Sequence, residues 1–253
     1  MFIENEASRA VVRCGDGCGF LIGAGTERYV VTTAHCLPYL PKPFVDESRI
    51  YRNFVDLMGK GPELAAECVF VDPVSDIAVL AAPDIFKWTY EAQTYTWLVG
   101  DSQGLPVAKD SEDSDDMQVG WLVQNGSWFS CRYCPGDAVS LPDGLCVSGP
   151  VDWFFGHYVC EFSRPIVGGM SGSPILNDRG AVIGILTNSN SAPDNKHTEG
   201  VLVPRLTYYL PGWILSELDG FGELSGGLCN HCAGMSEAND SGVTAAYGQS
   251  SGS

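Results

Sequence analysis

Short runs of residues rich in Val, Ile, Tyr, Phe and Trp recur along this chain, and Gly, Pro, Asn and Asp separate them. Runs of this composition favour strands, and long runs with a helical period are scarce. The expected strands span residues 29–33, 67–71, 77–81, 117–123, 128–133, 151–162, 181–187 and 200–203. A chain of 253 residues built in this way is expected to be all-β, as one large domain or two smaller units.

One serine stands in a tight turn that would expose its hydroxyl. Ser171 lies in the segment VGGMSGSP, residues 167–174, with glycines on both sides and a proline after them. Two upstream residues could complement it: His35 ends the β-rich run 29–36, and Asp76 comes just before the apolar run 77–80. A serine nucleophile needs an imidazole to take its proton, and a carboxylate to hold that imidazole in one tautomer.

Each of these residues has an ordinary explanation when taken alone. A glycine-rich turn, a histidine at a strand end and an aspartate in a turn are all common. Their occurrence together, in the order His35, Asp76, Ser171, predicts a catalytic triad of the chymotrypsin order.

Three motifs carry a resemblance to a known family, namely TAHC at 33–36, DIAVL at 76–80 and GMSGSP at 169–174. Two weaker matches are GCGFLIG at 17–23 and GILTNS at 184–189. Through them the chain resembles the trypsin-like (chymotrypsin-fold) serine peptidases, most closely the HtrA-type and other bacterial branches. The order and separation of the motifs fit across most of the chain.

The resemblance implies a peptidase domain over residues 1–222 with two antiparallel six-stranded β-barrels and the site in the cleft between them. The first barrel is expected at about 8–104 and the second at about 118–208, with an acidic linker at about 105–117. Pro204 at an allowed first-turn position predicts a C-terminal helix that ends at about residue 219. Residues 223–253 contain cysteines and then mostly Gly and Ser, which predicts a flexible tail.

By position in the family, the N–H groups of Gly169 and Ser171 would form the oxyanion hole. In trypsin-type zymogens an aspartate directly before the serine pairs with a new amino terminus, and here Met170 stands in its place. Activation by insertion of a terminus is therefore not expected, and a regulatory protein partner is one source of control. The substrate-binding residues carried over in this way are Pro165, Ile166, Gly168, Thr187, Asn188 and Ser189. The segment 163–167 contains no acid, so a mainly apolar or small pocket is expected.

Other residues compete for these roles and are ranked lower by their context. Ser173 stands where the family usually has a second glycine, and Asp72 precedes a proline. His157 lies in an apolar run where packing is the expected role, whereas His197 and His231 lie in polar or Cys-rich loops.

The formal net charge of −17 disfavours nucleic acid and anionic membranes as partners. The resemblance implies a protein or peptide substrate. No apolar run approaches the roughly 20 residues that span a bilayer. The amino terminus also lacks the basic-then-apolar pattern of a signal peptide, so a cytoplasmic location is expected.

Ten cysteines leave several alternatives open. Two Cys-x-x-Cys pairs could form one structural zinc site, although a long separation weakens this signal; the four residues are Cys131, Cys134, Cys229 and Cys232. Other contributors considered are Cys14, Cys18, Cys146 and Cys160. Free thiols and disulfides are the alternatives, and the resemblance implies a bridge from Cys36, for which Cys18 is the nearby partner.

Taken together, these patterns predict a serine endopeptidase that needs no cofactor for catalysis. The alternative is a latent or catalytically silent relative that binds a peptide or a partner. A third hypothesis is a zinc-stabilised interaction domain.

Overall fold

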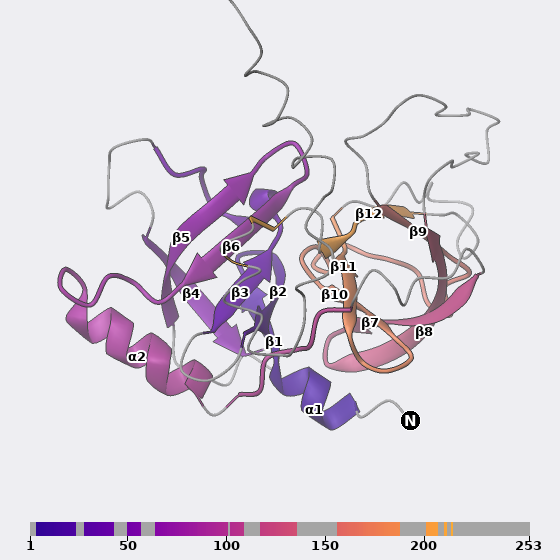
Figure 1. Cartoon of the computed structure of the whole chain (residues 1–253), viewed down its shortest axis with the longest axis horizontal. Helices are drawn as coiled ribbons and strands as arrows, with labels where there is room; N and C mark the ends of the chain where they lie inside the picture. Colours follow the sequence, from indigo (N-terminus) through magenta and orange to yellow (C-terminus); the bar gives the residue numbers. More distant parts are fainter. Residues whose placement is uncertain are drawn as a thin grey trace, which may run out of the picture.

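Two antiparallel β-sheets lie side by side and make up most of the molecule (Figure 1). The computed structural model describes residues 4–23, 28–42, 50–56, 64–100, 102–108, 117–135, 156–187, 201–206, 210–211 and 214. Within these ranges, no helix has both the length and the apolar character needed to cross a membrane.

The first sheet is formed by the amino-terminal half of the chain. Its strands are β1 (Val11–Cys14), β2 (Gly17–Ile22), β3 (Tyr29–Thr32), β4 (Ile50–Asp56), β5 (Leu64–Asp72) and β6 (Ile77–Ala81). They follow the order β1-β2-β3-β6-β5-β4, and β4 pairs back onto β1, so the sheet closes on itself. The strands β2, β3 and β6 are buried along almost their whole length, as their nearly continuous apolar sequences require.

The second sheet also has six strands. They are β7 (Gln118–Gln124), β8 (Ser127–Pro135), β9 (Gly156–Cys160), β10 (Pro174–Asn177), β11 (Val182–Ile185) and β12 (Val201–Pro204), in the order β11-β10-β7-β8-β9-β12. A single bridge, Gly184 to Arg205, connects its two ends. The expected mostly-β architecture with two antiparallel units is confirmed, whereas a continuous ladder closes only the first of them.

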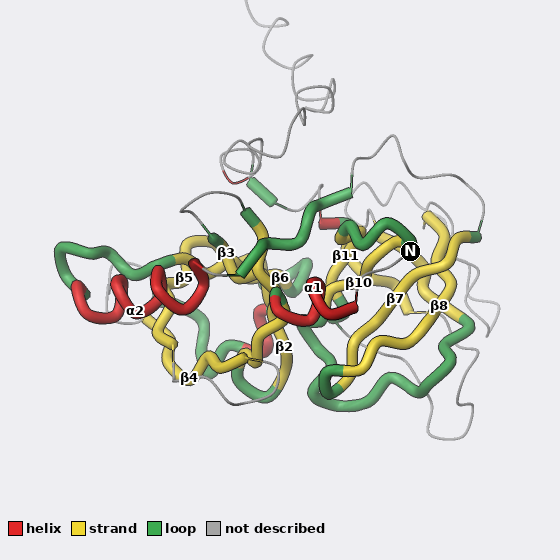
Figure 2. The backbone as a smooth tube through the Cα atoms, turned by 90° about the horizontal axis from the view of Figure 1, so that it is seen from below, coloured by secondary structure: helices red, strands yellow, loops and turns green. Residues whose placement is uncertain are grey.

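Among the described residues, two α-helices lie outside the sheets, α1 (Glu4–Arg9) and α2 (Thr89–Gly100). Figure 2 shows α2 on the outside of the first sheet and α1 near the junction of the two sheets. The α2 helix packs against β5, and the hydroxyl of its buried Tyr95 donates to the Arg28 carbonyl at 2.8 Å. The sequence pattern did not predict α2, because Tyr90 and Trp97 are exposed and break the apolar period that marks an amphipathic helix.

The connection between the sheets contacts both of them. Leu105 forms a parallel bridge to Ile22 in β2, and Val107 forms one to Val182 in β11. The acidic residues 109–116 of the expected linker lie outside the described residues, as does the tail 223–253. Of the expected C-terminal helix, Leu206 and Ile214 are helical and buried, and most of the remainder is outside the description.

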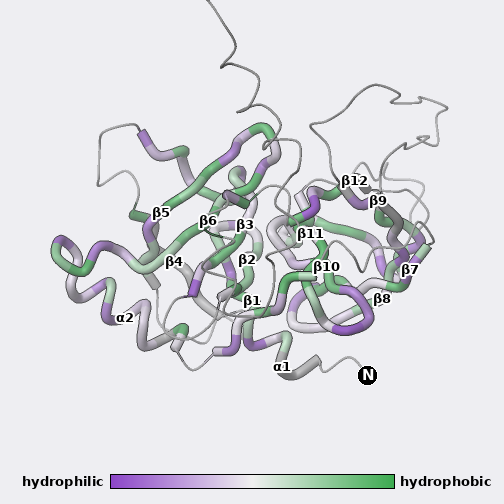
Figure 3. Tube along the Cα trace, in the orientation of Figure 1, coloured by the Kyte–Doolittle hydropathy of each residue, from purple (hydrophilic) through white to green (hydrophobic). Residues whose placement is uncertain are grey.

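Hydrophobic residues follow the strands of both units (Figure 3). One core cluster fills the closed sheet and extends into the second unit through Leu176, Val182 and Ile185. A second cluster fills the other sheet and includes Met170 and Ile175. Because the first cluster contains side chains from both sheets, the junction between them is fixed by packing.

Candidate active site

His35 and Asp76 form a tight pair at the edge of the closed sheet. The Nδ1 atom of His35 lies 2.6 Å from Oδ2 of Asp76, and the His35 main-chain N–H donates to Oδ1 at 2.9 Å. The main-chain N–H of Ala34 also donates to the carbonyl of Asp76, at 3.1 Å. The Asp76 side chain is 26% exposed and that of His35 is 49% exposed, so the pair is anchored on the protein side and open on the other.

The turn before β6 holds Asp76 in an uncommon backbone conformation. Its φ angle is +56°, a left-handed region that aspartate tolerates better than most residues. Asp72 stabilises this turn, because its Oδ1 accepts the Val74 N–H at 2.9 Å. Partial burial alone would raise the pKa of Asp72, but the hydrogen bonds from Ser75 and Val74 together outweigh it, so this pKa lies below its usual value. The competing aspartate therefore supports the turn that carries Asp76.

Ser171 lies on a loop, residues 167–173, that both sheets hold and that we call the nucleophile loop. On one side the Ser171 carbonyl accepts the Cys18 N–H at 2.7 Å. On the other side Gly172 N–H donates to the Leu186 carbonyl at 2.7 Å, and Leu186 N–H donates to the Ser173 carbonyl at 2.9 Å. Gly172 has a φ of +81°, and a Cβ there would collide with the Cys18 carbonyl oxygen. The glycine is required by this close approach.

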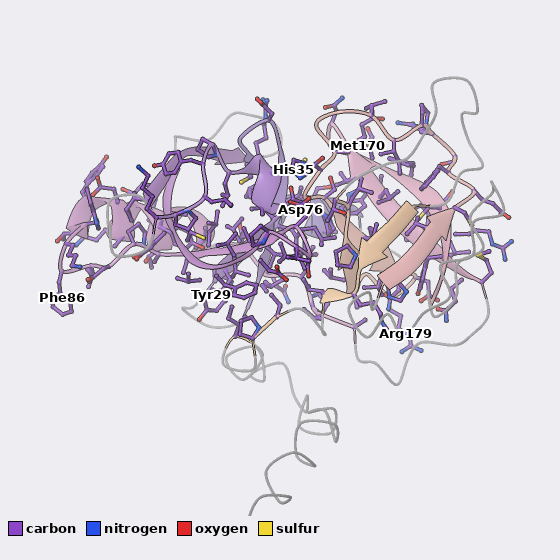
Figure 4. All side chains as sticks on the ribbon, turned by 90° about the horizontal axis from the view of Figure 1, so that it is seen from above. Tyr29, His35, Asp76, Phe86, Met170 and Arg179 are labelled. Atoms are coloured by element: carbon purple, nitrogen blue, oxygen red, sulfur yellow. The ribbon has the colours of Figure 1, made fainter. Side chains whose placement is uncertain are left out.

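The structure brings the predicted histidine and serine segments into contact. Cys36 follows His35 in the short helix η1 (Ala34–Cys36), and its Sγ lies 3.7 Å from the Ser171 carbonyl oxygen. Within the described ranges the Ser171 hydroxyl donates to the Thr187 carbonyl, at 3.3 Å, and not to His35. Figure 4 shows His35 and Asp76 together at the junction, with Met170 of the nucleophile loop on the facing side.

The predicted oxyanion donors lie next to this serine. Gly169 has a φ of +87°, which glycine adopts without strain. The N–H groups of Gly169 and Ser171 have no acceptor among the described residues, as the predicted oxyanion hole requires. Met170 between them is buried in the second core cluster, and its sulfur accepts the Val167 N–H at 3.4 Å.

The predicted substrate-binding residues are only partly described. Pro165 and Gly168 are exposed, Ile166 is half-buried, and Thr187 contacts the Ser171 hydroxyl. Asn188 and Ser189 lie outside the described residues, so a role for them stays a prediction.

Three of the competing residues are described and have structural surroundings. His157 is buried, and its ring meets that of Tyr133 edge to face, with centroids 5.2 Å apart. Ser173 is buried beside Cys18, and Asp72 belongs to the turn that carries Asp76. His197 and His231 lie outside the described residues.

Buried thiols lie directly beneath the nucleophile loop, a feature that the sequence reasoning missed. Cys18 Sγ lies 3.4 Å from the Gly169 carbonyl, and Thr33 Oγ1 donates to Cys36 Sγ at 3.0 Å. Cys14, Cys18 and Cys36 are all free and buried. Burial raises the pKa of each of them, for Cys14 to about 12, so the thiols stay protonated at neutral pH. The bridge between Cys36 and Cys18 implied by the resemblance is absent from this structure.

The structure describes only part of the predicted four-cysteine zinc site. Cys131 is a free, buried residue of β8, and burial raises the pKa of its thiol to about 12. Cys229 and Cys232 lie outside the described residues, so the four-cysteine site stays a prediction. In the part of the chain that the structure describes, no three His, Cys, Asp or Glu side chains are grouped to hold a metal ion.

A small hollow of about 180 Å³ opens beside the nucleophile loop. Its walls come from the β1–β2 hairpin, the tip of the β7–β8 hairpin and residues 167–170. Arg13, Asp16 and Asn125 contribute polar side chains to it. Nothing in the sequence marked these residues, because they become neighbours only when the two sheets meet.

Comparison with known proteins gives one family match. Residues 17–185, about two thirds of the chain, match the model of the trypsin-like peptidase domain. No curated protein sequence matches the chain.

Solved structures that are similar to this chain share few identical residues with it. The active form of the Rv3671c protease from M. tuberculosis is 19% identical, with 85% of this chain and 82% of that chain covered and a TM-score of 0.45. The MamO protease domain from Magnetospirillum magneticum is 16% identical, with 85% and 98% covered and a TM-score of 0.48. A human pathogenic astrovirus serine protease is 17% identical, with 81% and 94% covered and a TM-score of 0.43.

Proposed function

Because the chain belongs to the trypsin-like peptidase family, we propose that it is a serine endopeptidase that cleaves peptide bonds with Ser171, His35 and Asp76. The observation that carries this proposal is the double contact of Asp76 with His35, through both the ring Nδ1 and the main-chain N–H. A carboxylate in this position favours the tautomer with the proton on Nδ1, which leaves the lone pair of Nε2 free to act as a base.

The proposed reaction has two halves. The Ser171 oxygen attacks the substrate carbonyl while His35 takes its proton, and the N–H groups of Gly169 and Ser171 stabilise the negative oxygen that forms. His35 then gives the proton to the departing amine, which leaves an acyl group on Ser171. A water molecule, deprotonated by the same imidazole, releases this acyl group. These steps need no cofactor.

The Ser171 hydroxyl must turn from the Thr187 carbonyl before it can attack. We expect the Ser171 side chain to rotate in this way when substrate binds, since hydrogen bonds between catalytic groups are often long in proteins without substrate. The observed orientation of the Ser171 hydroxyl, toward the Thr187 carbonyl, favours the second candidate. This candidate is a latent or silent member of the family that binds a peptide or a partner protein. Both candidates have proteins or peptides as their ligands.

Hydrolysis of an unbiased peptide library, followed by mass spectrometry, tests the proposal. We expect cleavage by the wild-type protein, and a loss on the order of 10⁶-fold in Ser171→Ala, because no other group supplies the nucleophile. Ser173→Ala is the matched control two residues away, and it should retain cleavage. Equal cleavage by wild type and Ser171→Ala would contradict the proposal.

The latent alternative predicts a different result. A silent binding module gives no cleavage under any condition, whereas a latent enzyme gains cleavage when a partner is added. Reaction of Ser171 with a fluorophosphonate, with and without cell extract, separates these two outcomes.

A further inference from the structure

The hollow beside the nucleophile loop has no role in the proposed mechanism. Arg13 lies on β1 between two buried neighbours, Val12 and Cys14, so its own side chain faces outward from a fixed strand. Asp16 lies in the turn after β1, and Asn125 lies at the tip of the β7–β8 hairpin. Two exposed glycines of the nucleophile loop, Gly168 and Gly169, form another part of its wall.

The position of the hollow relates it to one half of a substrate. The nucleophile loop has two flanks: Thr187 and Leu186 contact one, and Cys18 contacts the other. This inference rests on the proposed function and on the predicted substrate-binding residues Thr187, Asn188 and Ser189, which we take to hold the acyl half of the substrate. The leaving half must then pass over the opposite flank. The hollow is on that flank, because Gly17 and Cys18 line it together with Gly169.

The groups in the hollow favour an anion. Arg13 forms no ion pair with another described residue, although it lies close enough to Cys18 for its charge to act on that thiol. The side-chain amides of Gln124 and Asn125 can donate hydrogen bonds, as can the Gly168 N–H, which has no acceptor among the described residues. Asp16 is the one acidic residue among those that line the hollow. A planar guanidinium with amide donors around it matches a carboxylate.

We propose that this hollow is a subsite for a carboxylate on the leaving-group side of the substrate, that Arg13 selects this carboxylate and that Asp16 weakens the selection. The carboxylate can belong to an acidic side chain beyond the cleaved bond or to the free carboxyl end of a short substrate. Arg13 therefore determines specificity on the leaving-group side of the cut, next to residues 167–170 of the nucleophile loop.

Acyl transfer measures this selection without knowledge of the preferred cleavage site. The ester p-nitrophenyl acetate acetylates Ser171 and releases p-nitrophenolate in a burst. A dipeptide amide then competes with water for the acetyl group. Its amine nitrogen bonds to the acetyl carbon, the bond from that carbon to the Ser171 oxygen breaks, and His35 moves the amine proton to this oxygen. The ratio of acetyl-dipeptide to acetate reports how well each dipeptide occupies the leaving-group side.

The nucleophiles compared are Ala-Glu-NH₂, Ala-Gln-NH₂ and Ala-Lys-NH₂, with Ala-Ala as the free acid and as the amide. In wild type we expect Ala-Glu-NH₂ to be used about three- to five-fold better than Ala-Gln-NH₂, the size of an exposed ion pair. The preference should fall at high salt, because exposed charges are screened. A preference for the free acid of Ala-Ala over its amide assigns the carboxyl end as a source, whereas the Glu preference assigns a side chain.

Three variants locate the effect. In Arg13→Gln, the use of Ala-Glu-NH₂ relative to Ala-Gln-NH₂ should fall to a ratio of about one. In Asp16→Asn, this ratio should rise about two-fold above that of the wild type. Arg179→Gln, in the turn between β10 and β11 and not among the residues of the hollow, should leave the ratio unchanged (Figure 4). The ratio is internal to each variant, so altered folding or acylation does not imitate the result.

Each outcome decides the proposal. A burst with no carboxylate preference in wild type, a preference for Lys, or a Glu preference that survives in Arg13→Gln overturns the leaving-group subsite and leaves the proposed function standing. Absence of the burst overturns the proposed function, and the subsite with it.

Discussion

At the scale of single residues, Asp76 connects the backbone of the site to its chemistry. It accepts from the Ala34 and His35 main chain as well as from the His35 ring. Its left-handed backbone is held by a turn that Asp72 supports. The orientation of the imidazole is therefore set by the folded loop, before any substrate binds.

Asp76→Asn tests this role of the carboxylate. Asparagine keeps the size and one acceptor, but its amide N–H₂ faces Nδ1 and favours the wrong imidazole tautomer. We expect kcat to fall on the order of 10⁴-fold with little change in stability. Asp178→Asn, in the exposed turn after β10, removes the same charge and should have no such effect on kcat. A small loss of kcat in Asp76→Asn would show that the carboxylate does not orient the base.

Gly172→Ala tests the close approach of the nucleophile loop to β2. The new Cβ would meet the Cys18 carbonyl oxygen at a positive φ, so we expect a loss of about 2–4 kcal/mol in the free energy of unfolding. Gly100→Ala at the end of α2 has open space around its Cβ and should change stability by about 1 kcal/mol or less. Chemical denaturation of both variants gives the comparison, and equal stability would contradict the packing described here.

At the scale of secondary-structure elements, α2 depends on its buried side and not on its aromatic content. Tyr95→Ala removes a buried ring and its hydrogen bond to Arg28, so unfolding should become easier by about 3–5 kcal/mol. Trp97→Ala on the same helix removes a side chain that is 71% exposed, and its effect should stay within about 0.5 kcal/mol. Thermal unfolding of the two variants, measured in parallel, gives the comparison. A larger loss of stability in Trp97→Ala than in Tyr95→Ala would contradict this account.

The motifs at His35, Asp76 and Ser171 could be found from the sequence, because short turns carry local signatures. Every expected strand overlaps an observed one within the described residues. The helix α2 could not be found, because Tyr90 and Trp97 interrupt its apolar period. The hollow at Arg13 and the thiols beneath the loop depend on contacts between distant segments, and no local pattern reports these.

At the scale of the whole molecule, a core shared by both sheets fixes the junction at which the candidate triad lies. Each of the two core clusters contains a buried thiol, Cys14 in the first and Cys131 in the second. Burial raises the pKa of both thiols from 9.0 to about 12. Ionisation of these groups therefore opposes folding of both halves.

Stability should consequently fall at alkaline pH. Between pH 9 and 12 the unfolded chain releases these protons and the folded chain keeps them, so folding loses about 1.4 kcal/mol per pH unit for each thiol. The contribution of the two thiols to the free energy of unfolding keeps its full value below pH 9 and declines as the pH rises toward 12. Guanidinium unfolding at about pH 8 and about pH 10.5 measures this loss, and Cys14→Ala should reduce it by about 2 kcal/mol. An unchanged pH dependence in Cys14→Ala would show that this thiol is not buried.

The central claim is that His35 and Asp76 from one sheet activate Ser171 from the other. The most direct measurement is the site at which a fluorophosphonate attaches to the native protein, mapped by mass spectrometry of its peptides. The account predicts one adduct per molecule, on Ser171, that disappears when the protein is unfolded and is strongly reduced in His35→Ala. An adduct on Ser173 or another residue, or equal labelling of Ser171 in His35→Ala, would contradict it.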